Sequence, residues 1–438
     1  MIAQFLFLIL LVIGIVFFVK SVKRLKNNIM IGKDFSPIGS KKDRLWQMVL
    51  IALGQKKMFK RPIPAFLHLI IYVGFLFINI ELLEIIIDGL FGTHRVFLPV
   101  LGIPFYTFLI NFFEFFAVGV IVVCIVFLIR RNVIGIKRFS GEEMSKWPKL
   151  DANLILVFEI LLMLFLLNMN ATDTAIQIKE QASSPLSFWA SKWFVPLYEN
   201  ASLNSIHLAE RFYWWAHFCG ILCFANYVLY SKHLHIFLAF PNTYFTNIEP
   251  KGQMANMPAI TQEVQLMMNP SAAATNPPEE IARFGAKDVQ DLSWKNLLEA
   301  YSCTECGRCT SNCPANLTGK KLSPRKIMMD TRDRAEEVGL NRKKHGEAHD
   351  DGKSLIDDYI TEEELLACTT CNACVEACPV NINPLNIILE LRRYKTMEES
   401  KVPNEWTGMY QNVETSFNPW KFPPSDRFNW ANELKKDE

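Results

Sequence analysis

The chain has 438 residues, of which 50% are hydrophobic, and its formal net charge is +2. A chain of this length forms two or three domains. So small a charge says little about partners, and no nucleic-acid partner is expected. The long apolar runs are confined to the first 240 residues, so a membrane part is expected before a polar part.

Five segments of the first half are apolar over about 20 residues, the length that crosses the hydrocarbon core of a bilayer. They are residues 2–19, 64–88, 104–129, 152–171 and 210–231. The first has no basic residue before it and no small-residue cleavage site after it. We therefore expect an uncleaved anchor rather than a signal peptide.

Basic residues gather in two of the four loops between these segments. Residues 20–61 and 130–149 are rich in lysine and arginine, whereas the other two loops carry only Arg95, Lys179 and Lys192. Basic loops stay on the cytoplasmic side. This predicts a multi-pass protein of the bacterial inner (cytoplasmic) membrane, with its amino terminus outside and everything after the fifth span in the cytoplasm.

Histidines are concentrated in and beside the apolar segments. They are His68, His94, His207, His217, His233 and His235. Ionisable residues at membrane depth are rare and usually functional, and two facing histidines bind a haem iron. His217 and His235 are about five helical turns apart, so they share a face if the helix continues. We predict that His68 and His235 hold a haem b near the cytoplasmic side. His217 is the candidate for a second haem, with His94 as its remaining partner.

Other interpretations of these polar residues stay open. A membrane histidine can simply hydrogen-bond a neighbour, and His207 and His233 fit contacts to haem propionates or quinone equally well. Four acidic residues also fall within the spans: Glu81, Glu84, Glu114 and Glu159. They either carry protons to a quinone or pair with polar neighbours inside the bundle, and their spacing favours the structural role.

The second half divides by composition into three parts. Residues 241–285 have no sustained period and are predicted as a linker, residues 286–394 as a helical domain, and residues 395–438 as an extended tail. Helical patterns lie at 294–301, 323–340, 361–367 and 385–394. The expected fold is mainly α, with a five-helix transmembrane bundle (1–240) followed by a cytoplasmic helical ferredoxin domain.

Two cysteine runs in the helical domain share the spacing C-x2-C-x2-C-x3-C-P. They are Cys303, Cys306, Cys309, Cys313 and Cys368, Cys371, Cys374, Cys378. A single C-x-x-C allows zinc or a redox dithiol, but this repeated run is typical of two [4Fe–4S] clusters whose fourth cysteines are exchanged. Cluster one then takes Cys303, Cys306, Cys309 and Cys378. Cluster two takes Cys368, Cys371, Cys374 and Cys313. The other cysteines, Cys124, Cys219 and Cys223, are expected to be buried apolar residues.

The two halves resemble two known families. The membrane half is similar to the gamma subunit of respiratory nitrate reductase, through Arg61-Pro62, His68 and the stretch Ser231–His235. The cysteine half is similar to the heterodisulfide reductase iron–sulfur family and to the helical ferredoxin domain of succinate dehydrogenase, through Cys303–Cys309 and Ser323-Pro324-Arg325. Joined, they resemble membrane-bound iron–sulfur oxidoreductases of the heterodisulfide reductase type.

The resemblance implies an electron-transfer subunit of a quinone-linked oxidoreductase. Electrons would pass between a soluble cytoplasmic partner, two [4Fe–4S] clusters, haem b and quinone or menaquinone. Catalytic residues remain unknown. The rival hypothesis is a membrane-anchored iron–sulfur sensor or scaffold without haem or quinone turnover. Of the basic residues at the inner end, Arg61 and Lys232 are expected to contact haem propionates or, preferably, phospholipid.

Two departures from the family pattern bear on partners and cofactors. The second span carries one histidine, His68, where the gamma subunit carries two. No Cys-Cys pair occurs, although larger members continue into domains with Cys-Cys-Gly. We therefore expect the catalytic module on a separate chain, either such a cysteine-rich subunit or a flavoprotein such as electron-transfer flavoprotein, docked by the tail.

Overall fold

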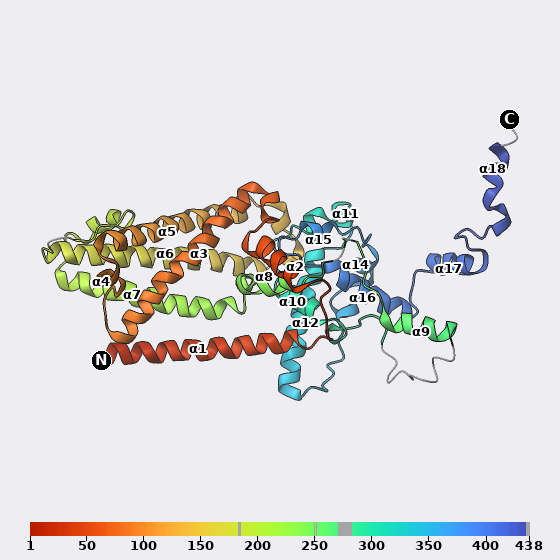
Figure 1. Ribbon diagram of the computed structural model, residues 1–438, viewed down its shortest axis with the longest axis horizontal. Helices are drawn as coiled ribbons and strands as arrows, with labels where there is room; N and C mark the ends of the chain where they lie inside the picture. The colour runs from red at the N-terminus through yellow and green to blue at the C-terminus, as the bar shows by residue number, and fades with distance from the viewer. Residues whose placement is uncertain (183–184, 249, 251, 270–282, 435–438) are drawn as a thin grey trace.

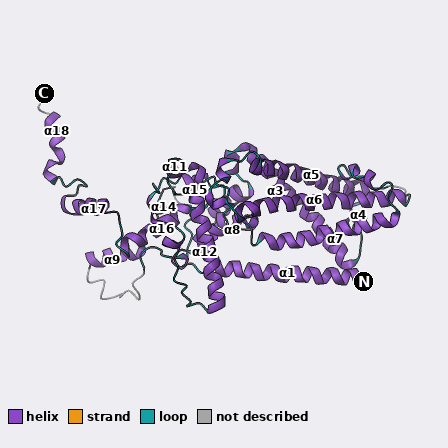
Figure 2. Ribbon diagram, turned by 180° about the vertical axis from the view of Figure 1, so that it is seen from behind, coloured by secondary structure: helices purple, strands orange, loops and turns teal. Residues whose placement is uncertain are grey.

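The computed structural model describes residues 1–182, 185–248, 250, 252–269 and 283–434. Long helices run side by side at one end of the molecule, and a group of shorter helices lies at the other end (Figure 1). The amino terminus lies at the far end of the long helices. Apart from turns, loops and two isolated β-bridges, the described residues are helical (Figure 2). This confirms the mainly α fold.

Five long helices form the bundle. They are α1 (Ile2–Ile29), α3 (Pro62–Phe91), α5 (Ile103–Asn132), α6 (Trp147–Lys179) and α7 (Leu203–Val228). The first four are each long and apolar enough to cross a membrane. Only 11% of the apolar window of α1 is buried, so most of its surface is apolar and open, as a lipid-facing helix requires. The chain is therefore a membrane protein.

The fifth predicted span ends early. Helix α7 stops at Val228, and η7 (Lys232–Leu234) with α8 (His235–Tyr244) continues at an angle of 89°. The two parts have the length and composition of a span only when they are counted together. The Ser231 hydroxyl accepts a hydrogen bond from the N–H of His233 (3.0 Å) and starts the new turn. The helix does not continue from His217 to His235, so the condition for a shared face of these two histidines is not met.

A buried polar network holds the end of the bundle far from the short helices. Arg95 donates hydrogen bonds to Asp173 (2.7 Å), Tyr106 (2.9 Å) and Asn170 (2.9 Å). Glu84 accepts from Tyr106 (2.9 Å), and Glu114 accepts from Asn170 (3.1 Å). Both acids therefore have the structural role that their spacing favours. Glu81 is 3% exposed, and among the described residues its Oε2 has no hydrogen-bond partner.

The second group of helices surrounds the cysteine runs. The longer ones are α10 (Trp294–Tyr301), α12 (Pro324–His345) and α16 (Pro384–Met397). The shorter ones are α11 (Pro314–Leu317), α13 (Leu355–Asp358), α14 (Glu362–Leu366) and α15 (Ala373–Ala377). Thr361 begins α14 with a capping box to Glu364. Leu297, Ile327 and Ile387 are fully buried in the core of this second group of helices. The helical patterns read from the sequence are confirmed.

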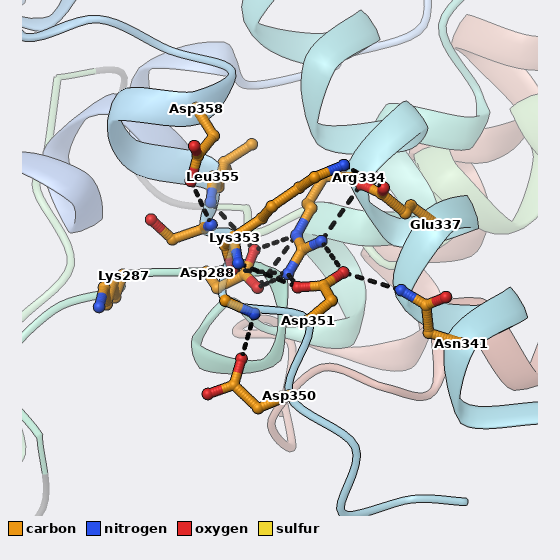
Figure 3. A network of polar contacts seen from close by, with 12 residues as sticks. Lys287, Asp288, Arg334, Glu337, Asn341, Asp350, Asp351, Lys353, Leu355 and Asp358 are labelled. Carbon is orange, nitrogen blue, oxygen red and sulfur yellow. Dashed lines mark hydrogen bonds and ion pairs between the residues drawn. The ribbon is translucent and has the colours of Figure 1, made fainter. Parts of the chain in front are cut away.

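One buried arginine fastens the loop that separates the two cysteine runs (Figure 3). Arg334 on α12 donates to Asp288 (2.7 Å), to Asp351 (2.7 Å) and to the carbonyl oxygen of Lys353 (2.7 Å). Its side chain is 2% exposed. The hydrogen bonds from Arg334 hold the pKa of Asp351 well below its usual range. The end of this polar loop is therefore tied to the domain core.

The helical domain packs directly against the bundle. Helix α12 crosses the end of α1, where a Cβ on Gly339 would stand 2.0 Å from Asn28 Oδ1. Asn28 donates a hydrogen bond to the Tyr301 hydroxyl (3.1 Å), and Arg24 pairs with Glu336 (3.5 Å). Helix α2 (Lys41–Met48) also packs on α8. These contacts place the cysteine runs next to one end of the bundle.

The carboxy-terminal tail reaches away from the body of the molecule (Figure 1). It contains α17 (Asn404–Ser416) and α18 (Asn429–Leu434), so parts of the tail that was predicted to be extended are helical. Trp406, Met409, Tyr410 and Val413 have the i, i+3, i+4, i+7 spacing of one helix face.

Helix α9 (Pro258–Met268) lies within the predicted linker. Residues 249, 251 and 270–282 of that linker, and residues 435–438 of the tail, lie outside the described residues. The division of the whole chain into four parts stays a prediction.

Candidate functional site

The first three cysteines of run one and the last cysteine of run two line a single cavity. They are Cys303, Cys306, Cys309 and Cys378. Cys303 follows α10, and Cys378 follows α15. Helix α15 packs against the η10 turn (Thr310–Asn312) that follows Cys309, which brings the two runs together. The arrangement corresponds to the exchanged ligand set expected for cluster one.

The remaining four cysteines form the second set. Cys374 interacts electrostatically with Cys313, Cys368 and Cys371. Cys374 and Cys313 are buried, whereas Cys371 is exposed. Cys309 also interacts with Cys374, so the two sets are neighbours. The second set therefore has the more solvent-accessible edge.

Burial disfavours ionisation of these thiols in the absence of metal. Burial, reinforced by the neighbouring thiols, raises the pKa of Cys303 and Cys374 to about 12. Burial raises the pKa of Cys378 to about 11. Thiols this reluctant to ionise become thiolates when they coordinate metal.

Cationic groups and a tight turn surround the first set. Arg308 and Arg325 line its cavity and are 5% and 1% exposed. Gly307, directly before Arg308, has φ +70°, and a Cβ there would lie 2.6 Å from Arg325 Nη1. The turn therefore requires glycine. Beside the second set, Arg392 donates to the carbonyl oxygen of Cys368 (2.6 Å). Such charges favour anionic sulfur ligands.

Two of the predicted haem histidines come together where the bundle meets the helical domain. His68 lies in the second turn of α3 and His235 at the start of α8, and their ring centres are 6.3 Å apart with the ring planes at 42°. Two imidazoles that bind one metal from opposite sides at about 2 Å have centres about 6 Å apart. His233 lies beside them, 5.4 Å from His235.

Hydrogen bonds orient both rings. His68 Nδ1 is bonded to Gln55 Oε1 (3.1 Å), and His235 Nδ1 is bonded to the carbonyl oxygen of Lys232 (3.2 Å). An Nδ1–H that donates to oxygen leaves Nε2 with its lone pair for a metal. The residues present therefore fit a bis-histidine haem. Gln55 is 5% exposed. No sequence signal marked it, because its role depends on a fold-dependent contact.

The other histidines are separate from this pair. His217 is buried in α7, and its Nδ1 is bonded to the Leu162 carbonyl oxygen (3.0 Å). His94 is exposed and lies 3.5 Å from Asp173, and His207 lies 3.4 Å from Glu180. In the described part of the chain, no hydrogen bond or ring contact joins His217 to His94. A second haem stays a prediction.

The cysteine loop and the histidine pair are joined by charged residues. Glu305, between Cys303 and Cys306, forms an ion pair with Lys232. Arg308, between Cys306 and Cys309, interacts electrostatically with His68. Lys232 thus contacts an acid of the cysteine loop, and the expected contact with phospholipid or propionate stays a prediction. Its side chain is 10% exposed. The functional residue that the sequence-based predictions missed is Glu305. It is an acidic residue between two cysteines that are expected to be anionic sulfur ligands.

Comparison with known proteins places these features in context. Residues 302–382 match the family model of a 4Fe-4S dicluster domain. The chain is 28% identical to "Probable iron-sulfur-binding oxidoreductase FadF" of Bacillus subtilis, over 99% of this chain and 61% of that protein. It is 26% identical to "EtfAB:quinone oxidoreductase" of Syntrophomonas wolfei, over 89% of this chain and 54% of that protein.

A heterodisulfide reductase also provides a relative. One component of the dihydromethanophenazine:CoB–CoM heterodisulfide reductase of Methanosarcina acetivorans is 28% identical over 33% of this chain and 36% of that protein. No solved structure matches the chain significantly. The chain spans between about half and three fifths of the length of its two long relatives. Together, the helices, cysteines and relatives describe a membrane-associated protein with a 4Fe-4S dicluster domain that is similar to iron–sulfur oxidoreductases.

Proposed function

We propose that the chain is the membrane electron-transfer subunit of a quinone-linked oxidoreductase. Electrons pass between a soluble cytoplasmic partner and quinone by way of the two cysteine sets and the His68–His235 pair. The observation that carries this proposal is the contact of one cysteine loop with both histidine-bearing segments. Within seven residues, that loop contains Glu305, which pairs with Lys232 just before α8, and Arg308, which lies 3.5 Å from the carbonyl oxygen of Met58 in the turn before α3.

The positions of the two cysteine sets suggest different roles in electron transfer. The second cysteine set has an exposed member, Cys371, and offers the edge at which a soluble partner exchanges electrons. The loop of the first set contacts the segments that precede both histidines. When bound, the clusters and haem b carry single electrons, while quinone takes up electrons with protons. Burial and the ordered ligands keep each group in one geometry.

The partners are proposed by analogy with the relatives. One relative is named for EtfAB and quinone, and others are components of heterodisulfide reductases. For this chain we propose quinone or menaquinone in the membrane, and either a flavoprotein such as electron-transfer flavoprotein or a Cys-Cys-Gly subunit in the cytoplasm. The tail after residue 394, with exposed Trp406, Trp420 and Trp430, is the proposed docking segment.

The proposed orientation has the amino terminus outside the bacterial inner membrane and the cysteine sets in the cytoplasm. The amino terminus and the helical domain lie at opposite ends of the bundle (Figure 1). Lys57, Lys60 and Arg61 lie at the end next to the cysteines, where Lys60 pairs with Glu376. Basic residues at the cysteine end support a cytoplasmic location for it.

The test is to count cofactors in the natively purified protein. Visible spectra and paramagnetic resonance during a redox titration should reveal haem b and two [4Fe–4S] clusters. His68→Ala and His235→Ala should each abolish the haem absorbance and leave the cluster signals. His345→Ala, an exposed histidine at the end of α12, is the matched control. Clusters without haem in the wild-type protein would instead favour the sensor or scaffold.

A further inference from the structure

Glu305 is a buried acid in the loop that carries the first three cysteines. It is 3% exposed and lies on a left-handed backbone, with φ +54°. Its carboxylate accepts from Arg332 Nη1 on α12 (2.8 Å) and forms an ion pair with Lys232. Burial alone would raise its pKa, but Lys232 and Arg332 hold the pKa below its usual value. Glu305 is therefore bound both to Arg332 of its own domain and to Lys232 at the end of the bundle.

Lys232 connects this acid to a histidine of the pair. Its ammonium group also donates to the Pro148 carbonyl oxygen (2.6 Å), and its backbone N–H donates to Asp151 (3.1 Å). Its own carbonyl oxygen accepts from His235 Nδ1 (3.2 Å). One residue thus orients the His235 ring and holds the cysteine loop.

The same loop reaches the other histidine-bearing segment. Arg308 Nη1 lies 3.5 Å from the carbonyl oxygen of Met58, in the turn that precedes α3. Its charge also acts on His68. The cysteine loop therefore contacts the residues that precede both histidines. Glu305 pairs with Lys232, three residues before His235, and Arg308 contacts Met58 in the turn before α3.

The energetics of the Glu305–Lys232 pair indicate a geometric role. Desolvation offsets much of the attraction in a buried ion pair, so such pairs contribute more to a defined arrangement than to stability. A left-handed backbone is also unfavourable for a residue with a side chain. Both features are expected where a precise position is needed.

We propose that Glu305 is a positioning residue that, through Lys232, holds the first cysteine set and His235 at one fixed distance and orientation for electron transfer. This inference rests on the proposed function, because it needs a haem at the histidine pair. Looser docking would lengthen the path between the two cofactors and slow the electron, without removing either one.

The test compares Glu305→Gln with wild type in lipid nanodiscs. After rapid reduction of the clusters by a low-potential soluble donor, haem absorbance is followed by stopped flow. We expect haem reduction to slow about tenfold or more, with unchanged haem and iron content. The low-spin haem resonance should shift as well, because the His235 ring loses its fixed orientation.

Two further variants separate positioning from misfolding. Lys232→Met leaves Glu305 paired with Arg332, and should slow haem reduction as much as Glu305→Gln does. The double variant should be no slower than either single variant, because the two residues act as one unit. Glu363→Gln removes the partner of Lys321 in an exposed pair and is the matched control, with the wild-type rate.

The outcomes are distinct. Wild-type reduction rates and resonance in both Glu305→Gln and Lys232→Met would overturn the positioning role and leave the proposed function standing. A wild-type protein that contains clusters but no haem would overturn the proposed function itself. Additive slowing in the double variant would show that Glu305 and Lys232 act separately, which also overturns the inference.

Discussion

The bundle and the helical domain differ in what they expose more than in what they bury. The bundle exposes apolar faces, as on α1, whereas the helical domain exposes many charged residues. Both have apolar cores, with residues such as Leu166 in the bundle and Leu297 in the domain. Lipid is as apolar as leucine, so apolar burial does not drive helix association in a membrane. Buried polar contacts, such as those of Glu114 and Asn170, therefore add specificity to the bundle, whereas apolar burial from water stabilises the domain.

The junction between these regions combines ion pairs with close packing. It contains the buried pair of Lys232 with Glu305 and the partly exposed pair of Arg24 with Glu336. It also has a close backbone approach at Gly339. At the junction, the cysteine sets of the helical domain must be aligned with the histidine pair of the bundle. Four perturbations test how the bundle, the domain and the junction between them are held together.

The largest effect is expected from breaking the exchange of cysteines. Cys378→Ser should remove the cluster held by the first run although it lies in the second run, and iron should fall by about half. Cys374→Ser should remove the other cluster. Paramagnetic resonance distinguishes the two. Loss of the same cluster in both variants would contradict the exchange, and Cys223→Ser, an exposed thiol on α7, should keep all the iron.

Breaking the polar network of the bundle should come next. Arg95→Met leaves Asp173 and its neighbours buried without their cation, which should lower the free energy of unfolding by about 3–5 kcal/mol. Thermal unfolding in detergent measures this. Lys149→Met is the control, since Lys149 in the first turn of α6 is exposed. Equal stability of the two variants would show that polar contacts do not specify the bundle.

Crowding the junction should have a smaller effect. In Gly339→Ala the new methyl group displaces Asn28, and overpacking of this kind destabilises by about 1–3 kcal/mol, partly offset by better helix propensity. Limited proteolysis should then separate the helical domain from the bundle more readily. The control is Gly408→Ala on α17, where a Cβ meets nothing within 4 Å. Equal proteolysis of both variants would argue against tight docking there.

The smallest effect concerns pH and the helical domain alone. Because the folded pKa of Asp351 is depressed by Arg334, its stabilising contribution is complete above the unfolded value of about 4 and is lost as pH falls below it. Asp351→Asn should be less stable than wild type by about 1 kcal/mol near neutral pH. The difference in melting temperature should close in acid. A constant difference across that range would contradict the role of the ionised carboxylate.

Several features could be read from the sequence because they depend on local pattern. The hydropathy of α1, α3, α5 and α6 predicted spans, and the cysteine spacing predicted a dicluster domain, which the family match bears out. His68 and His235 were paired by an argument that needed a continuous helix, and α7 is broken before His235. They nevertheless lie together, because α8 turns back toward the start of α3.

Local pattern therefore determined which residue types and elements this protein has: apolar helices, two thiol runs and histidines at the bundle end. Only the tertiary structure decided that Gln55 and Lys232 orient the histidine rings and that Glu305 spans the junction. The physical reason is that hydrogen bonds and ion pairs form between groups brought close by folding. Glu305 and Lys232 are distant in the chain, and no period or composition records that they meet.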